Sequence, residues 1–216
     1  MSKISLAQNT LHYFLGIQIT RTASSLFLSQ SKYVEYLLVK SEMVDAKPCD
    51  TPCLSYHRLF KDDGEHYSNP KLYRNIVGAL QYLTFTKRDI AFFVHQVMQN
   101  PMVSHFTAIK RILQYLKGTM HFGISYTRGD LRLKAFSDAD WAGDPNYRRS
   151  TTGLVVFLGN NPISWYSKKQ QTVSSFQIIN IINIHISLPY VPVLFVIICL
   201  QLPYLLILFS TKRPTT

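Results

Sequence analysis

The last third of this 216-residue chain lacks carboxylates, and most of it lacks charge of either sign. No Asp or Glu follows Asp144, and no Lys, Arg, Asp or Glu lies between Gln170 and Thr211. Hard divalent cations and many acid–base mechanisms depend on carboxylate side chains. The sequence therefore excludes any site that draws an acidic ligand from beyond Asp144.

Cysteine is also scarce, with Cys49, Cys53 and Cys199 as the three examples. Three cysteines do not form a disulfide framework, and we expect a reducing, intracellular compartment. The spacing of Cys49, Cys53 and His57 differs from that of common structural zinc sites, so we expect two thiols in a proline-containing loop. Met1 to Asn9 is polar with no apolar core, and we expect no secretory signal peptide.

Basic residues outnumber acidic ones by 23 to 12, which gives a formal net charge of +11. An excess of this size favours a polyanionic partner, and we predict weak, non-specific binding of RNA or DNA. The basic residues are scattered rather than grouped in blocks, a pattern equally typical of an ordinary solvated surface. We predict no small-molecule substrate.

Residues 188–209 are almost entirely apolar, with interruptions at Pro189, Pro192, Gln201 and Pro203. A run of this length can span a bilayer, and the Lys212 and Arg213 that follow would keep the C-terminus cytoplasmic. The alternative is a read-through or frame-shifted tract that happens to be hydrophobic, an origin compatible with membrane insertion. Three prolines weaken a helix here. We treat 188–209 as a candidate transmembrane segment.

The first 68 residues predict a hairpin, a helix and a long loop. Apolar and polar residues alternate in the first segment as in a half-buried strand. Ser31 is expected to be the N-cap of the helix. The expected elements are a strand at 11–19, a turn at 20–25, a returning strand at 26–30, a helix at about 32–42 and a loop at 45–68.

Three helices are expected next. The first begins at Asn69-Pro70, a polar cap followed by proline in the first turn. Asp89 is expected to cap a second helix, which runs from Ile90 to Gln99. The third runs from Ser104 to Gly118 and has a clear apolar side. Its outward-facing residues are Lys110, Arg111, Gln114 and Lys117.

A three-strand meander is expected after residue 130. Its strands are Leu131–Asp138, Thr151–Leu158 and Ile163–Ser167, ahead of Lys168 and Lys169. The first strand ends in clustered carboxylates, Asp138, Asp140 and Asp144. Such a cluster suits a divalent-metal nuclease, because Mg²⁺ takes hard oxygen ligands and two metals drive phosphodiester hydrolysis. One carboxylate cluster cannot hold two metals.

The meander resembles the start of the ribonuclease H domain in copia-type (Pseudoviridae) retrotransposon polyproteins. The residues that carry the resemblance are Phe136 to Asp144, Arg149 to Gly153, Phe157 to Gly159, Ile163 to Trp165 and Ser167 to Gln170. By that resemblance, Asp138 stands where the first metal-binding aspartate of the family stands. The family continues after Ser174-Ser175 with a glutamate-bearing helix and further acidic ligands, but this chain does not.

Earlier segments resemble the copia-type reverse transcriptase, in the stretch after its catalytic aspartates. Tyr13 to Ile17 looks like the hairpin that grips the primer end, through Phe14, Leu15 and Gly16. Residues 28–33, 46–49 and 51–52 resemble the palm-to-thumb passage. Residues 73–83 and 105–119 resemble the thumb and connection helices. The Tyr-x-Asp-Asp element that binds the polymerase metals lies upstream of this region in the family and occurs nowhere in this sequence.

The resemblance covers about Leu11 to Ser175 and implies an α+β fold. Residues 11–129 are expected to form a partial reverse transcriptase, with the end of the palm hairpin and the thumb and connection helices. Residues 130–175 are expected to form a truncated ribonuclease H-like β-meander, and 176–216 an unrelated hydrophobic tail. We predict a degenerate polyprotein fragment without catalytic activity, in which the Mg²⁺ of the intact family is not a functional cofactor.

Two alternatives to this interpretation remain open, and both are non-enzymatic. A residual nucleic-acid-binding module would use the hairpin residues and Lys110, Arg111, Lys117, Arg148, Arg149, Lys168 and Lys169. A small membrane-anchored protein would depend on 188–209 alone. Asp138 would bind a metal only if the missing ligands were supplied. Because this chain lacks the helices that cover the meander in the family, we expect the face with Val155, Phe157, Ile163 and Trp165 to be exposed.

Overall fold

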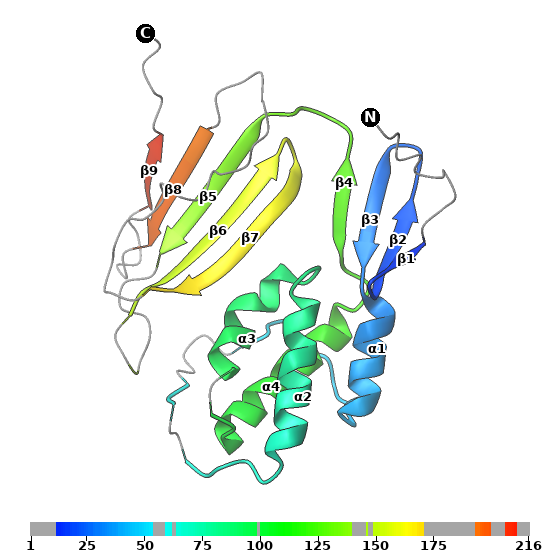
Figure 1. Ribbon diagram of the computed structural model, residues 1–216, viewed down its shortest axis with the longest axis vertical. Helices are drawn as coiled ribbons and strands as arrows, with labels where there is room; N and C mark the ends of the chain where they lie inside the picture. The colour runs from blue at the N-terminus through cyan, green and yellow to red at the C-terminus, as the bar shows by residue number, and fades with distance from the viewer. Residues whose placement is uncertain are drawn as a thin grey trace, which may run out of the picture.

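Two β-sheets and a group of helices make up the described part of the chain, with the helices gathered below the sheets in Figure 1. The structure is a computed structural model that describes residues 12–53, 59–61, 64–98, 100–139, 146, 149–170, 193–199 and 206–210. Helices and strands occur together in both halves of the sequence. The predicted α+β class is confirmed.

The first sheet has the strand order β1-β2-β3-β4, and each neighbouring pair is antiparallel. Its strands are β1 (Tyr13–Phe14), β2 (Ile17–Arg21), β3 (Ser25–Ser29) and β4 (Ile124–Thr127). The prediction of one continuous strand over 11–19 is wrong, because the chain reverses at Leu15 and Gly16. Both residues have positive φ, 46° and 74°, as a two-residue hairpin turn of the primed type requires.

The helices of the described residues enclose the larger hydrophobic core. They are α1 (Ser31–Lys40), α2 (Pro70–Leu83), α3 (Ala91–Val97) and α4 (Val103–Gly118), with a 3₁₀ turn, η1 (Arg88–Ile90), ahead of α3. Each helix places apolar side chains three or four residues apart on its inner side. The core residues Leu37, Leu80, Val94 and Leu116 are fully buried.

The starts of these helices test the predicted caps. The side chain of Asn69 accepts a hydrogen bond from the first turn of α2, which confirms that start. Ser31 is the first residue of α1 rather than its N-cap, and its Oγ donates to the Met120 carbonyl at 2.9 Å. Asp89 lies within η1 and does not cap α3; its carboxylate accepts from the Tyr115 hydroxyl. Ser31 and Asp89 therefore make tertiary contacts instead of capping a helix.

The second sheet has the strand order β7-β6-β5-β8-β9. Its strands are β5 (Leu133–Ala139), β6 (Thr151–Leu158), β7 (Asn161–Lys169), β8 (Val193–Cys199) and β9 (Leu206–Ser210). The antiparallel trio β5, β6 and β7 confirms the predicted meander. Strand β8 pairs parallel to β5, and β9 pairs antiparallel to β8.

The described parts of 188–209, the candidate transmembrane segment, are therefore strands. Among the described residues, no helix has the length and apolar character that crossing a bilayer requires. Short apolar runs do not distinguish strands from helices by periodicity, and this one is rich in β-branched residues and interrupted by prolines. Strand propensity therefore explains why these parts form strands.

The second sheet buries one face in a small core and turns the other toward η1 and α3. The buried residues of the first face are Leu133, Ala135, Leu154 and Val156. On the second face Val155, Phe157 and Trp165 are half-buried. The prediction that this face is exposed is therefore only partly right. Trp165 Nε1 donates to the Thr84 carbonyl after α2 at 3.2 Å, and Ile163 packs against the small core instead.

A side-chain amide joins the two sheets edge to edge. Asn161, at the start of β7, accepts from the Thr127 backbone N–H at 2.8 Å and donates to the Thr127 carbonyl at 2.7 Å. Thr127 is the last residue of β4. The amide thus reproduces the two-bond pattern of a strand pair and links β4 to β7.

Candidate functional site

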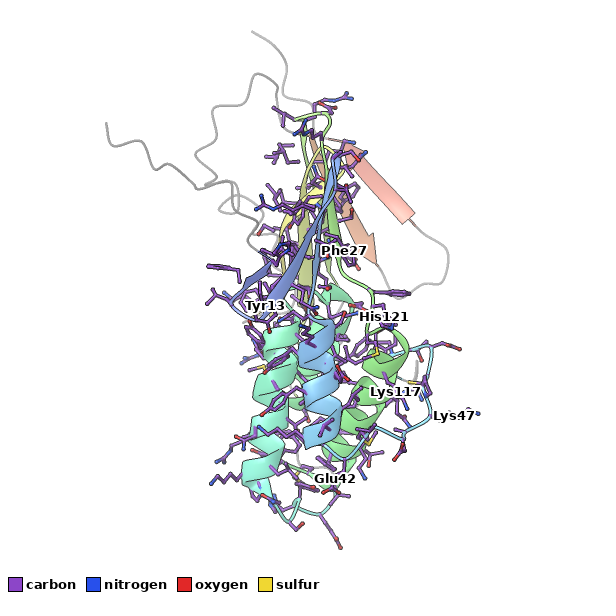
Figure 2. All side chains as sticks on the ribbon, turned by 90° about the vertical axis from the view of Figure 1, so that its right-hand side faces the viewer. Tyr13, Phe27, Glu42, Lys47, Lys117 and His121 are labelled. Carbon is purple, nitrogen blue, oxygen red and sulfur yellow. The ribbon has the colours of Figure 1, made fainter. Side chains whose placement is uncertain are left out.

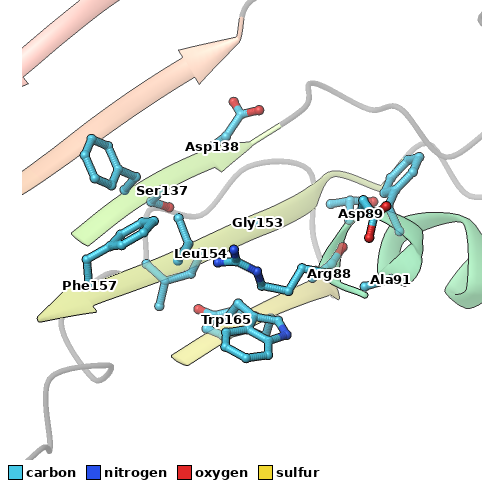
Figure 3. Close-up of a pocket in the computed structure, with 15 residues that line it drawn as sticks. Arg88, Asp89, Ala91, Ser137, Asp138, Gly153, Leu154, Phe157 and Trp165 are labelled. Carbon is cyan, nitrogen blue, oxygen red and sulfur yellow. The ribbon is translucent and has the colours of Figure 1, made fainter. Parts of the chain in front are cut away.

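Asp138 lies near the end of β5, on the sheet face that looks toward η1 and α3 (Figure 3). Leu133, Ala135 and Ser137 are at most 5% exposed. Because side chains alternate along a strand, Phe136 and Asp138 project from the opposite face. The Asp138 side chain is exposed, as the resemblance to a metal-binding aspartate requires.

The described residues beside Asp138 supply no second carboxylate. Its register partners are Gly153 on β6 and Ile197 on β8. Within the described ranges, no group of three or more His, Cys, Asp or Glu is placed to hold a metal ion. Asp140 and Asp144 lie outside those ranges. Two-metal hydrolysis needs several carboxylates around both ions, so the described donor set does not fit Mg²⁺.

Two lysines lie at the same end of the sheet as Asp138. Lys168 and Lys169 end β7, and their register partners on β6 are the two residues that precede Gly153, the partner of Asp138. Neighbouring strands lie about 4.8 Å apart, which separates β7 from β5 by roughly 10 Å. Lys168 is exposed and Lys169 is half-buried. This strand end therefore combines one carboxylate with positive charge that can attract phosphates.

An open cleft of about 620 Å³ lies between the Asp138 face and the helices η1 and α3 (Figure 3). Its sheet wall is mainly apolar and includes Phe136, Val155, Phe157 and Trp165. Arg88 reaches across from η1, and its guanidinium carbon lies 5.1 Å from the Trp165 ring centroid, in cation–π geometry. The cleft thus joins an aromatic wall to a cation from the helical region.

Asp89 also lines the cleft, but its carboxylate is engaged by Tyr115. Burial is the larger cause that raises the pKa of Tyr115 to about 12, and the hydrogen bond to Asp89 adds to it. A tyrosine with a raised pKa stays protonated and keeps donating to the carboxylate. Asp89 is therefore a structural acceptor rather than a partner for Asp138.

The hairpin predicted to hold Phe14, Leu15 and Gly16 is confirmed as a hairpin. Phe14 and Leu15 are 54% and 72% exposed at its tip. A Cβ at Gly16 would lie 2.6 Å from the Tyr82 hydroxyl of α2, so the tip approaches α2 as closely as glycine allows. The structure thus fixes the hairpin beside α2; its role toward a primer stays a prediction.

The three basic residues predicted to face outward from α4 differ in their surroundings. Lys110 is exposed, with its Nζ 5.4 Å from the Phe106 ring centroid. Arg111 Nη2 donates to Thr51 Oγ1 at 2.7 Å, and Lys117 Nζ donates to the carbonyls of Ala46, at 2.9 Å, and of Val44. Figure 2 shows Lys117 next to the loop that carries Lys47. Arg111 and Lys117 therefore hold this loop against α4.

Cys49 and Cys53 are free thiols on the same loop, as expected. Cys49 Sγ donates to the Arg111 carbonyl at 3.5 Å. Burial raises the pKa of the Cys53 thiol, and the charge of Arg111 partly offsets that rise. His57 lies outside the described residues.

The sequence alone did not reveal which of the predicted site residues lie close together. The fold brings Asp138, Lys168 and Lys169 to one sheet end, while Lys110 stands apart on α4. Arg88 was missed altogether, because no periodicity places a single residue of a 3₁₀ turn over a distant sheet. The tryptophan motif around Trp165 was the available signal, since a half-buried aromatic on a sheet face attracts a cation.

Sequence comparison finds close relatives of this chain. It is 48% identical over 167 residues, 76% of its length, to the retrovirus-related Pol polyprotein from transposon RE1 of Arabidopsis thaliana. It is 37% identical over 174 residues to the corresponding polyprotein from transposon TNT 1-94 of Nicotiana tabacum. An uncharacterized mitochondrial protein of Arabidopsis thaliana is 47% identical over 168 residues, which are 70% of that protein.

Each match to a polyprotein covers most of this chain but only a small part of the polyprotein. The aligned segment is 76% of this chain but 11% of the RE1 polyprotein, and 74% of this chain but 13% of the TNT 1-94 polyprotein. No protein-family model and no solved structure matches the chain. The identity of nearly half over three quarters of the sequence is decisive, and the chain belongs to the family of retrovirus-related Pol polyproteins of copia-type transposons.

Proposed function

We propose that this chain binds nucleic acid weakly through phosphates and catalyses neither polymerisation nor cleavage of RNA–DNA hybrids. The proposal depends on the residues at one end of the second sheet. There Asp138 has Gly153 and Ile197 beside it, and Lys168 and Lys169 provide positive charge. A lone carboxylate does not assemble two metals, whereas lysines contribute phosphate binding without a metal.

We assign residues 11–129 to the end of the reverse transcriptase palm, the thumb and the connection. We assign residues 130–175 to the start of ribonuclease H. Three features support this assignment: the hairpin at Leu15 and Gly16, the helices α2 to α4, and the β5–β7 meander, all in the family order. The chain spans little more than a tenth of the transposon polyproteins that it matches. Their activities as whole proteins therefore do not pass to it by similarity alone.

The binding surface that we propose centres on Lys168 and Lys169, with a smaller part for Lys110. Arg111 Nη2 and Lys117 Nζ already donate to the loop at 44–51. Phosphate contact there would have to replace hydrogen bonds within the fold. We therefore expect those two residues to matter more for stability than for binding.

Binding to a labelled RNA–DNA hybrid, followed by fluorescence anisotropy with the full chain, tests the proposal. Affinity should fall by about tenfold or more between low and physiological salt, because counterions are released from the phosphates. The double variant Lys168→Gln/Lys169→Gln should reduce the slope of log affinity against log salt by about one to two. Lys47→Gln, an exposed lysine on the loop after α1, is the matched control and should leave the slope unchanged.

Binding that does not respond to salt would contradict this proposal. So would a double variant with the slope of the parent chain, because the positive charge of the strand end would then be irrelevant.

A further inference from the structure

An aromatic row crosses the outer side of α1 and α2 and has no part in the binding surface described above. Its members are Tyr36, Tyr33, Tyr82 and Phe85, in spatial order. Successive ring centroids lie 6.1, 4.9 and 5.8 Å apart. Tyr36 and Phe85, at the two ends, are 55% and 61% exposed. Large rings with that exposure add little to the core, so the row offers its rings to solvent.

The hairpin tip extends this row. Gly16 lies against the Tyr82 hydroxyl, and the neighbouring Tyr13, Phe14 and Leu15 are all more than half exposed. Figure 2 shows Tyr13 at the level where the hairpin meets the upper ends of α1 and α2. Aromatic surface therefore continues from the helices onto the hairpin.

Positive charge borders the row on α1. Lys40 Nζ lies 5.7 Å from the Tyr36 ring centroid. On α2, the exposed Lys71 is on the side that carries Tyr82, but eleven residues separate the two, about 16 Å along the helix axis. Lys40 is thus the lysine that lies directly against a ring of the row.

We propose that the aromatic row stacks the unpaired bases of single-stranded nucleic acid, while Lys40 contacts its phosphates beside Tyr36. This inference rests on the proposed function and names the form of nucleic acid that is preferred. Exposed rings with nearby cations are the means by which proteins hold single strands without sequence preference. In a duplex the base faces are already stacked on each other, so the rings gain nothing from it. The positive charge of Lys40 against Tyr36 favours this polyanion over an apolar protein partner.

The test uses the full chain with a fluorescent oligothymidylate of about 20 nucleotides and a duplex of the same length. The single strand should bind about tenfold more tightly than the duplex. Tyr36→Ala and Phe85→Ala should each weaken single-strand binding by about tenfold and leave duplex binding unchanged. Tyr36→Phe keeps the ring and should bind as the parent does.

Phe60→Ala is the matched control, because Phe60 is 49% exposed but lies beside the start of α4, where its carbonyl accepts from His105. It should leave both affinities unchanged. Far-UV circular dichroism should show every variant folded, since the substituted rings are exposed.

Equal affinity for single strand and duplex, with no effect of the alanine variants, would overturn the inference and leave the proposed function standing. A self-association that is lost in Tyr36→Ala, without any change in single-strand binding, would overturn it in favour of a protein contact. Absence of salt-dependent binding to either probe would instead remove the proposed function itself.

Discussion

The helical region and the second sheet differ most in how much apolar surface each one buries. Among the described residues, the helical core contains 16 buried hydrophobic side chains and the core of the second sheet contains four. Burial of apolar surface is the main favourable term in folding. Among the residues whose burial is described, the helical core therefore contributes more to stability than the core of the second sheet, whose contacts with its neighbours include those of Trp165 and Asn161.

The largest expected effect is a core truncation in the helical region. Leu113 is 1% exposed on α4, and Leu113→Ala should lower the free energy of unfolding by about 2–5 kcal/mol. Urea unfolding followed by far-UV circular dichroism measures this loss. Leu131→Ala, at a position that is 57% exposed, is the control and should change stability little. A loss below about 1 kcal/mol for Leu113→Ala would mean that this core is not closely packed.

A smaller effect is expected at the junction of the two sheets. Asn161→Ala removes both hydrogen bonds to Thr127 and should cost about 1–2 kcal/mol. Because both tryptophans, Trp141 and Trp165, belong to the β5–β7 sequence, tryptophan fluorescence reports on the sheet and circular dichroism mainly on the helices. The two unfolding transitions should separate in the variant, with the sheet unfolding first.

Asn160→Ala, in the turn next to it, is the control and should keep the transitions as they are in the parent chain. Coincident transitions in Asn161→Ala would show that the sheet does not depend on this junction.

The smallest expected effect is a difference in alkaline stability. The folded pKa of Tyr115 is raised from 10.0 to about 12, chiefly by burial and also by Asp89. A raised folded pKa adds stability that is complete below pH 10 and is lost as the pH rises through about 12. Tyr115→Phe should therefore flatten the decline of stability over that range.

Burial also raises the pKa of Tyr166 in the second sheet. Tyr166→Phe should flatten the alkaline decline of stability less than Tyr115→Phe does. Urea midpoints at several alkaline pH values provide the measurement. An equal or larger effect of Tyr166→Phe would show that the hydrogen bond and charge of Asp89 do not add to the raised pKa of Tyr115.

Local signals predicted the elements whose ends are set by local chemistry. Asn69 and Pro70 start α2 because a polar cap and a fixed φ act within one turn. The meander was predictable because Gly159, with positive φ, makes a tight turn between two alternating strands. The hairpin at Leu15 was missed by periodicity, because leucine seldom adopts a positive φ.

Contacts between distant segments were not predictable from local patterns. A helical wheel turns Arg111 and Lys117 toward solvent, yet the loop at 44–51 returns and takes up their donors. Strand β8 pairs with β5 more than fifty residues away, and no periodicity encodes such a partner. The candidate site was therefore predicted residue by residue at Asp138, Lys168 and Lys169, while its geometry came from the fold.

We propose that this chain binds nucleic acid without hydrolysing it. Incubation of the full chain with a labelled RNA–DNA hybrid and Mg²⁺ or Mn²⁺, with the products separated on a denaturing gel, tests both parts at once. The hybrid should stay intact under conditions where anisotropy shows it bound, because the described residues beside Asp138 add no second carboxylate. Cleavage that disappears in Asp138→Asn would instead show that the missing ligands are supplied and that the chain is a nuclease.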